Sequence, residues 1–542
     1  MEDFKKKIIY QIYPMSFCDS NNDGMGDING IISKLDYLKE LGVGNLWLSP
    51  IYESNFNDNG YDINDYYKIN PKFGTMDDFE NLIKEAKKRD IGIIMDLVVN
   101  HTSNNHVWFK EALKDPKSKY RDYYYFREGK NGKLPNNWTS SFSGSVWEKV
   151  LNEDNMYYLH LYTKEQPDLN YHNEEVIKEV ENILEFYLKK GVVGFRCDVI
   201  NQIYKTSLEN GKFAFFNCGK EHYENQKENF EILTRLHKEV LDKYHGFLIG
   251  ETSNITPETG NKFLKTRGLD MFFEFEHSFC DMNGLVPIFR KKFKPCNLID
   301  PILVWQEKVP WIAIYLENHD QRRSITRYGD EAKYYKPSAK ALCMFLLSLK
   351  GTPFIYQGEE IGMTDYHDEY GLKDLDDCLT HMAIDSAKKL LHIKEETAFK
   401  LAQRTINRDN ARSPMQWNNK VNAGFNEGSK PWLKVNSNYK HGLNVETELN
   451  DEDSILHFYK EMIKFRNESK TLQEGEFIRL RSNKNVAKFL RKTKEETLLI
   501  SINLSSKLVK DDFDNYEILI SNDKNVEPGY LKPYQGLIYK IK

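Results

Sequence analysis

Apolar residues fall into two alternating patterns over the first hundred positions: short continuous runs, and longer stretches at helical spacing. The runs Ile8 to Tyr13, Asn45 to Leu48 and Ile91 to Val99 predict buried strands. Ile28 to Leu41 and Met76 to Arg89, where apolar residues recur every three or four positions, predict the helices between them. Strands that alternate with helices are typical of parallel strands joined by crossover helices.

The alternation stops after His101 and resumes near residue 174. From Thr102 to about Gln166 the chain is rich in Tyr, Trp, Ser, Asn and Lys, so we expect an inserted domain at 102–170 after the third strand. Beyond it we predict helices at Glu174–Lys190, Gln226–Tyr244 and Lys336–Leu349, and strands at Gly194, Phe247–Gly250, Met271–Phe275, Trp311–Leu316 and Pro353–Tyr356. Eight such units predict an α/β fold, a closed (β/α)8 TIM barrel built from residues 1–101 and 171–472.

The pattern changes again at about Gln473. Short alternating strands, such as Thr497 to Asn503 and Leu537 to Ile541, are separated there by turns of Asn, Asp and Lys. We therefore expect residues 473–542 to form a C-terminal antiparallel β domain.

Composition excludes several classes of protein. Hydrophobic residues make up 40% of the 542 and charged residues 29%, which is typical of soluble globular proteins. The net charge is −5 and no basic block is present, so we expect no nucleic-acid partner. No apolar run is long enough for a membrane span, and the N-terminus has too few apolar residues for a signal peptide. Seven scattered cysteines without a CxxC pair indicate reduced thiols, and we expect a cytoplasmic monomer or weak oligomer.

Polar residues follow several predicted strands at the point where each strand ends. The fourth strand, GFRCDVIN, carries Arg196 and Asp198; the fifth ends at Glu251; the seventh runs into ENHD with His319 and Asp320. Catalytic groups in such barrels come from the C-terminal ends of the strands. We therefore expect the three carboxylates to converge on one rim.

Converging carboxylates serve either metal binding or glycoside hydrolysis. A retaining glycosidase needs an ionised nucleophile and a protonated acid, about 5 to 5.5 Å apart. Arg196 lies two residues before Asp198 and would keep it ionised, which favours Asp198 as nucleophile. Glu251 has no cation beside it in the sequence and is then the acid/base, with Asp320 left to stabilise positive charge. The alternative is a structural Arg–Asp pair that closes a strand end.

Ten short motifs carry a family resemblance over nearly the whole chain: QIYPMSF, DGMGDINGI, GYDI, DLVVNHTS, QPDLN, GFRCDVIN, GETS, ENHDQ, KGTPFIYQGEEIGM and DNARSPMQW. In this order they resemble the α-amylase superfamily, within it the oligo-1,6-glucosidase branch. The resemblance implies the same three catalytic acids. It also implies that the non-reducing glucose is held by Asp62, His101, Arg196, His319 and Arg408, with Gln166 and Phe142 or Phe273 lining the pocket. The open alternatives are that the two histidines are core residues, that Arg408 forms a structural salt bridge, and that Arg412 takes its place.

The stretch DSNNDGMGD has the early ligand spacing of a calcium loop. Side-chain oxygens at Asp19, Asn21, Asp23 and Asp27 and the carbonyl of Met25 are the proposed ligands, and Gly24 permits the sharp turn. Gly30 stands where an EF-hand has its glutamate, so this is not an EF-hand. The resemblance implies a structural Ca²⁺ away from the sugar and no cofactor for catalysis; the alternative is an Asx-rich turn without metal.

Val199 follows the predicted nucleophile, and in the resembled branch a valine there accompanies a preference for α-1,6 bonds. The expected function is a retaining, exo-acting α-glucosidase that hydrolyses isomaltose, isomalto-oligosaccharides and panose, with the small oligosaccharide as its only expected partner. The main alternative is a trehalose-6-phosphate hydrolase, in which Arg322 or Arg323 would bind the phosphate. Further alternatives are an α-1,4-glucosidase, a sucrose-active enzyme and a non-catalytic amylase-like binding protein.

Overall fold

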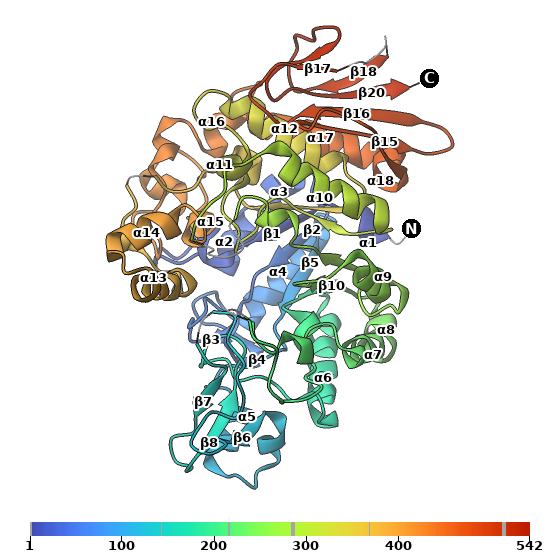
Figure 1. Cartoon of the computed structure of the whole chain (residues 1–542). Helices are drawn as coiled ribbons and strands as arrows, with labels where there is room; N and C mark the ends of the chain where they lie inside the picture. The colour runs from blue at the N-terminus through green and yellow to red at the C-terminus, as the bar shows by residue number, and fades with distance from the viewer. Residues whose placement is uncertain are drawn as a thin grey trace.

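A parallel sheet of eight strands curls into a nearly closed barrel at the centre of the molecule (Figure 1). The computed structural model describes residues 3–142, 144–214, 217–282, 288–367, 369–511 and 516–541. The strands, in chain order, are β1 (Ile9–Ile12), β2 (Asn45–Leu48), β5 (Gly92–Leu97), β9 (Gly194–Cys197), β10 (Phe247–Glu251), β11 (Met271–Phe273), β12 (Ala313–Ile314) and β13 (Thr352–Tyr356). Each lies where the sequence predicts a strand, and the predicted barrel is confirmed.

Helices connect successive strands on the outside of the barrel. They are α2 (Ile28–Ser33), α3 (Leu35–Leu41), α4 (Met76–Lys88), α6 (Glu174–Lys190), α7 (Lys227–Leu236), α8 (Asp242–Tyr244), α9 (Pro257–Lys265), α10 (Pro295–Lys308) and α12 (Tyr335–Ser348). The bounds of α6 match the prediction because both ends carry strong signals: Asn173 caps the first turn, and Gly191 adopts the left-handed conformation after the last. The single helix predicted over 28–41 is interrupted at Lys34 and forms two.

The alternation of side chains along β9 explains why charged residues lie inside the barrel. Phe195 and Cys197 pack outward against the helices, so Gly194 and Arg196 face the interior. In the parallel register Arg196 is level with Asp96 on β5 and with Ile249 on β10. At this level and below it, the interior is filled by an apolar cluster of Ile9, Trp47, Ile94, Phe247, Ile249, Met271, Phe273, Trp311, Ala313, Tyr315 and Phe354. The polar layer thus covers the apolar core at the C-terminal end of the strands.

The segment inserted after β5 contains α5 (Val107–Lys114) and an antiparallel sheet of β6 (Phe126–Glu128), β8 (Met156–Leu159) and β7 (Trp147–Lys149), at the lower end of Figure 1. A buried ion pair joins it to the barrel: Lys205 Nζ lies 2.6 Å from Asp168 and donates to Asn100 Oδ1 at 2.8 Å. The hairpin of β3 (Tyr52–Ser54) and β4 (Ile63–Ile69), which the apolar pattern does not predict, lies beside it.

A largely helical segment follows β13. It contains α13 (Cys378–Leu391), α14 (Glu395–Gln403), α15 (Asp409–Arg412), α16 (Val445–Leu449), α17 (Ile455–Glu468) and α18 (Lys470–Glu474). Two short helices lie elsewhere in the chain: α1 (Asp3–Lys6) precedes β1, and α11 (Ser324–Tyr328) precedes α12. Helices α13 and α14 share a small core with Tyr366 and Tyr370, separate from the barrel core.

The C-terminal part of the chain forms an antiparallel sheet, drawn in red in Figure 1. Its strands, in spatial order, are β14 (Glu476–Arg479), β15 (Val486–Lys492), β16 (Thr497–Asn503), β20 (Gly536–Ile541) and β18 (Glu517–Ser521), with β17 (Val509–Lys510) paired to β19 (Tyr530–Leu531) alongside. This β domain is also confirmed, whereas the domain boundaries stay predictions. Within the described ranges, no helix combines the length and apolar character that a bilayer span requires.

Candidate active site

One guanidinium, that of Arg196, binds three carboxylates at the C-terminal end of the barrel. Its Nη1 donates to Asp96 Oδ1 and to Asp198 Oδ1, both at 2.8 Å, and its Nη2 donates to Glu251 Oε2 at 2.5 Å. The Asp96 side chain is fully buried, whereas those of Asp198 and Glu251 are 11% and 15% exposed. Asp198 and Glu251 are therefore the two acids of this cluster that a bound molecule can reach.

The two partly accessible acids share one guanidinium and therefore lie close together. The two carboxyls bind one on each Nη of Arg196, and Glu251 opposes the rise in the pKa of Asp198 that burial causes. Carboxyls on the two Nη groups of one guanidinium match the short separation of retaining glycosidases, about 5 to 5.5 Å, better than the wider gap of inverting ones.

Arg196 does not set the two acids apart, contrary to the expectation from the sequence. In the sequence only Asp198 has a cation beside it, but in the folded chain the same guanidinium binds Glu251 as well. Contact with Arg196 therefore does not distinguish a nucleophile from an acid.

The remaining charges do distinguish them. Burial, opposed by Arg196 and helped by the carboxylates of Asp198 and Asp320, raises the pKa of Glu251 to about 8. Burial also raises the pKa of Asp198, with Arg196 lowering it and Asp96 raising it. The site thus holds a shared proton at neutral pH, and Glu251, which faces two more carboxylates, is the better place for it.

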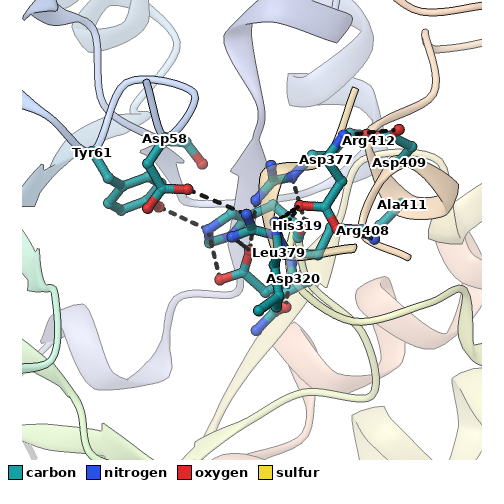
Figure 2. Close-up of polar contacts among 12 residues, drawn as sticks. Asp58, Tyr61, His319, Asp320, Asp377, Leu379, Arg408, Asp409, Ala411 and Arg412 are labelled. Carbon is teal, nitrogen blue, oxygen red and sulfur yellow. Dashed lines mark hydrogen bonds and ion pairs between the residues drawn. The ribbon is translucent and has the colours of Figure 1, made fainter. Parts of the chain in front are cut away.

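Asp320, in the loop after β12, has the opposite environment (Figure 2). Arg412 Nη2 donates to its Oδ1 at 2.7 Å, and Arg408 Nη1 donates to the same oxygen at 3.3 Å. Burial opposes ionisation, but these cations bring the pKa of Asp320 below its usual range. His319 lies 3.3 Å from the carboxylate; since burial lowers the pKa of His319 to about 3, its imidazole is neutral at pH 7 and the two arginines keep Asp320 ionised.

His319 is fixed as a neutral ring beneath the site. Its Nδ1 lies 2.7 Å from the amide nitrogen of Gln11, which can only donate, so the ring proton is on Nε2 and points to Tyr61 Oη at 2.8 Å. The Tyr61 ring stacks on it at 5.5 Å between centroids. His319 is therefore a buried, fully bonded residue whose Nε2 edge faces Asp320.

A second group of predicted binding residues is joined by hydrogen bonds around Tyr61 and Asp58. His101 Nε2 lies 3.1 Å from the carbonyl of Tyr61, and Gln166 Nε2 donates to that carbonyl at 3.1 Å and to Asp58 Oδ2 at 3.3 Å. Asp58 in turn accepts from Arg408 Nη2 at 3.2 Å. The structure thus joins His101, Gln166 and Arg408 in one polar network.

Asp62 does not belong to this network. It is fully buried, and its two oxygens accept from Ser54 Oγ at 2.7 Å and Asn57 Nδ2 at 2.9 Å, so its carboxylate shapes the loop instead of facing a ligand. Asp58, four residues earlier, occupies the position that the sequence argument gave to Asp62. The sequence cannot distinguish two acids in one loop, because the loop conformation decides which side chain faces the site.

The two phenylalanines and Val199 lie in different places. The Phe142 ring centroid lies 5.8 Å from the Arg408 guanidinium, whereas Phe273, level with Glu251, belongs to the apolar cluster inside the barrel. Val199 has φ 38° and ψ 38°, a left-handed conformation that is rare for a β-branched residue. Its backbone N–H donates to Glu251 Oε2 at 3.2 Å, so this strained turn places a donor on the acid.

The predicted calcium loop is a compact turn in which side-chain oxygens accept backbone N–H groups. Asp19 accepts from Asn22 and Gly24 at 2.7 and 2.8 Å, and Asp27 caps α2 by accepting from Gly30 at 2.6 Å. Asn21 and Asp23 each bind the backbone N–H two residues on. All the proposed ligand atoms, including the carbonyl of Met25, are oxygens, which suit a calcium ion, and Asp23 and Asp27 have lone pairs beyond these bonds. Asp19 also accepts from Asp23 and Asn426, so it would have to give up one of its four bonds to bind the ion.

Two contributors were missed at the sequence level, Asp96 and Asp58. Asp96 also accepts from Trp47 Nε1 at 3.2 Å and Tyr61 Oη at 3.1 Å, which makes it the buried anchor of Arg196. The alternation of side chains along the third strand could have predicted that Asp96 faces the barrel interior. For Asp58 the sequence offers no comparable signal.

Comparison with known proteins agrees with this geometry. A family model described as "Alpha amylase, catalytic domain" matches residues 11–475. An oligo-1,6-glucosidase of Parageobacillus thermoglucosidasius is 42% identical, with 99% of each chain covered, and a trehalose-6-phosphate hydrolase of Bacillus subtilis (strain 168) is 38% identical, with 99% of this chain and 98% of that one covered. The crystal structure of a Bacillus licheniformis trehalose-6-phosphate hydrolase superposes with a TM-score of 0.93 at 40% identity, covering 99% of both chains.

Replacing Glu251 with Gln is expected to stabilise the protein at about pH 8 by a few kcal/mol and to change little at about pH 4. Burial raises the pKa of Glu251 to about 8, so the folded protein keeps a proton that the unfolded chain has already released. Wild-type stability therefore falls as the pH rises toward 8, and a neutral amide removes that loss. Thermal unfolding at both pH values measures this, with the exposed Glu231→Gln as control; a variant no more stable than wild type at about pH 8 would contradict the pKa assignment.

Proposed function

Since this chain belongs to the α-amylase family, we propose that it is an α-glucosidase that hydrolyses α-1,6 bonds at the non-reducing end of short oligosaccharides with net retention. The single observation that carries the proposal is the contact of Asp198 and Glu251 on one guanidinium, with a raised pKa on Glu251. This is the acid pair that a double displacement at a sugar carbon requires.

In the first step, an Asp198 oxygen attacks the anomeric carbon while Glu251 gives its proton to the glycosidic oxygen. The bond to the leaving sugar breaks, and glucose stays bound to Asp198 as an ester. In the second step, Glu251, now ionised, takes a proton from water, whose oxygen displaces Asp198 and restores the original anomer. Asp320, kept ionised by Arg408 and Arg412, lies where it can stabilise the positive charge on the sugar ring in both steps.

The arrangement around the acids favours cleavage at a chain end. Phe142 comes from the inserted segment and Arg408 from the helical segment after the barrel, and their contact shows that these two segments meet beside the acids. A site covered from both sides accommodates one terminal sugar better than the middle of a chain. We propose that Asp58, His101, Gln166 and Arg408 hold that terminal glucose.

The preference for α-1,6 bonds has two supports. An oligo-1,6-glucosidase of Bacillus cereus is 41% identical over 99% of both chains. Val199 places its side chain directly after the nucleophile, and its backbone N–H binds the acid, so the residue type at this position affects how the leaving sugar approaches Glu251.

The trehalose-6-phosphate alternative is weakened by the two arginines that would bind phosphate. Arg322 is 5% exposed and its Nε donates to Asp365 at 2.6 Å. Arg323 is fully buried and its Nη1 donates to Glu317 at 2.9 Å. Both guanidiniums are already paired, and neither can receive a phosphate without breaking a buried ion pair.

Two further properties belong to the proposal. The oxygen-rich loop at 19–27 would bind a structural calcium ion through Asp19, Asn21, Asp23, Met25 and Asp27. A cytoplasmic location is supported by the cysteines, all seven of which are free.

Asp198→Asn is expected to lower turnover on isomaltose by at least about a thousandfold without loss of fold, because an amide cannot form the glycosyl ester. Isomaltose, panose, maltose, sucrose and trehalose 6-phosphate, assayed side by side with the product anomer read by NMR, test the whole proposal. Release of β-glucose would contradict retention, and a strong preference for trehalose 6-phosphate would favour the alternative.

Val199→Thr is expected to lower the isomaltose to maltose ratio of kcat/KM about tenfold, within the 1 to 3 kcal/mol that a change of this size is worth. Both rates are measured on the same enzyme preparation, so errors in active concentration cancel. An unchanged ratio would remove Val199 from the account of linkage preference.

Calcium is expected to raise the Tm of protein previously treated with EDTA, because an ion that binds only the folded state stabilises it. Asp23→Ala should abolish the rise; this side chain, unlike Asp27, does not cap a helix. Identical melting curves with and without calcium would show that the loop is a metal-free turn.

A further inference from the structure

Arg408 lies at a junction of three carboxylates that come from distant parts of the chain (Figure 2). Its Nη2 donates to Asp58 Oδ1 at 3.2 Å and its Nη1 to Asp320 Oδ1 at 3.3 Å. The shortest bond, 2.7 Å, runs from Nε to Oδ1 of Asp377, the residue that precedes α13. The two Nη groups thus face the site, while Nε faces away from it.

Asp377 has no capacity left for a ligand. It is fully buried, and Oδ1 accepts from Arg408 Nε and from the backbone N–H of Leu379 at 3.2 Å. Oδ2 accepts from Thr380 Oγ1 at 2.5 Å and from the backbone N–H of Arg408 at 3.2 Å. Four donors occupy the two oxygens, so any effect of Asp377 on the reaction must pass through its neighbours.

The backbone of Asp377 is itself fixed. Asp409, next to Arg408 in the chain, accepts at Oδ2 from the backbone N–H groups of Asp376 and Asp377 at 2.8 and 3.2 Å. The hydroxyl of Tyr370 donates to the same oxygen at 2.5 Å. Asp377 and Arg408 are therefore held together both by their side chains and by the adjacent backbone.

We propose that Asp377 is a positioning residue for sugar binding: it anchors Arg408 at Nε and at the backbone, and so presents the two Nη groups to Asp58 and Asp320. An arginine side chain loses considerable rotamer entropy when it is ordered, and an anchor present before the ligand arrives removes that cost from binding. The inference rests on the proposed function, because it assumes that Arg408 and Asp58 hold the terminal glucose.

The test uses Asp377→Ser in the full-length enzyme. Serine is a good N-cap and can still accept from Leu379, so α13 keeps its first turn, but its side chain is too short to bind Arg408 Nε. We expect kcat/KM for isomaltose to fall at least tenfold, mainly through KM, and competitive inhibition by glucose to weaken by a similar factor. The pH profile of kcat should stay unchanged, because Asp198 and Glu251 do not contact Asp377.

Two controls separate positioning from general damage. Asp374→Ser alters an acid of the same segment that binds the backbone of Gly371 at 3.0 Å and pairs with Lys434 at 3.5 Å; it should leave kcat/KM within twofold of wild type. Asp377→Ser in an Arg408→Ala background should likewise change kcat/KM less than twofold, since a residue that acts through Arg408 has nothing left to position.

The outcomes distinguish the two claims. Wild-type enzyme that cleaves no α-glucoside would overturn the proposed function together with this inference. An active wild type with unchanged kcat/KM in Asp377→Ser, or an equal loss in the presence and absence of Arg408, would overturn the inference alone.

Discussion

The site depends on one constraint: the acids at the end of the barrel outnumber the cations that bind them. At the end of the barrel, one guanidinium serves Asp96, Asp198 and Glu251, so full ionisation would leave two buried negative charges without a partner. The cluster has a lower free energy when one of its carboxyls keeps a proton. Asp320, in contrast, has two cations for one carboxylate, because Arg408 and Arg412 both bind it. A carboxylic acid and a carboxylate thus coexist in one site because the cations are unevenly distributed.

The barrel makes this distribution possible. Parallel strands in register bring Asp96 and Arg196 to the same level of the interior, and Glu251 ends the neighbouring strand. Apolar side chains fill the barrel beneath them and keep water away from the lower side, so the charges interact in a medium of low polarity. The left-handed turn at Val199 is the local strain that accompanies this geometry, and it supplies a backbone donor to Glu251.

Much of this could be predicted from the sequence, and the failures have physical causes. The eight strands were predictable because buried parallel strands are continuous apolar runs, and Asp198, Glu251 and Asp320 were found because they follow such runs. The contact of Arg196 with Glu251 was missed because the sequence does not show which side chains of neighbouring strands come into contact. Asp58 and Asp62 were confused because loop conformation, not composition, decides which carboxylate faces the site. The role of Asp377 could not be anticipated, since it lies in a segment without the strand and helix alternation that guided the rest.

The catalytic acids and the residues proposed to bind the sugar lie on different kinds of structural element. Asp96, Arg196, Asp198 and Glu251 stand on or directly after strands, whose pairing fixes them within the barrel. Asp58, Asp320, Arg408 and Asp377 come from four separate loops, and Arg408 binds the other three. Changes in the loops can therefore alter how a sugar is held while the acid pair stays in place, whereas any change at Arg196 affects both acids at once. A barrel that separates chemistry from binding in this way can serve related substrates with one mechanism.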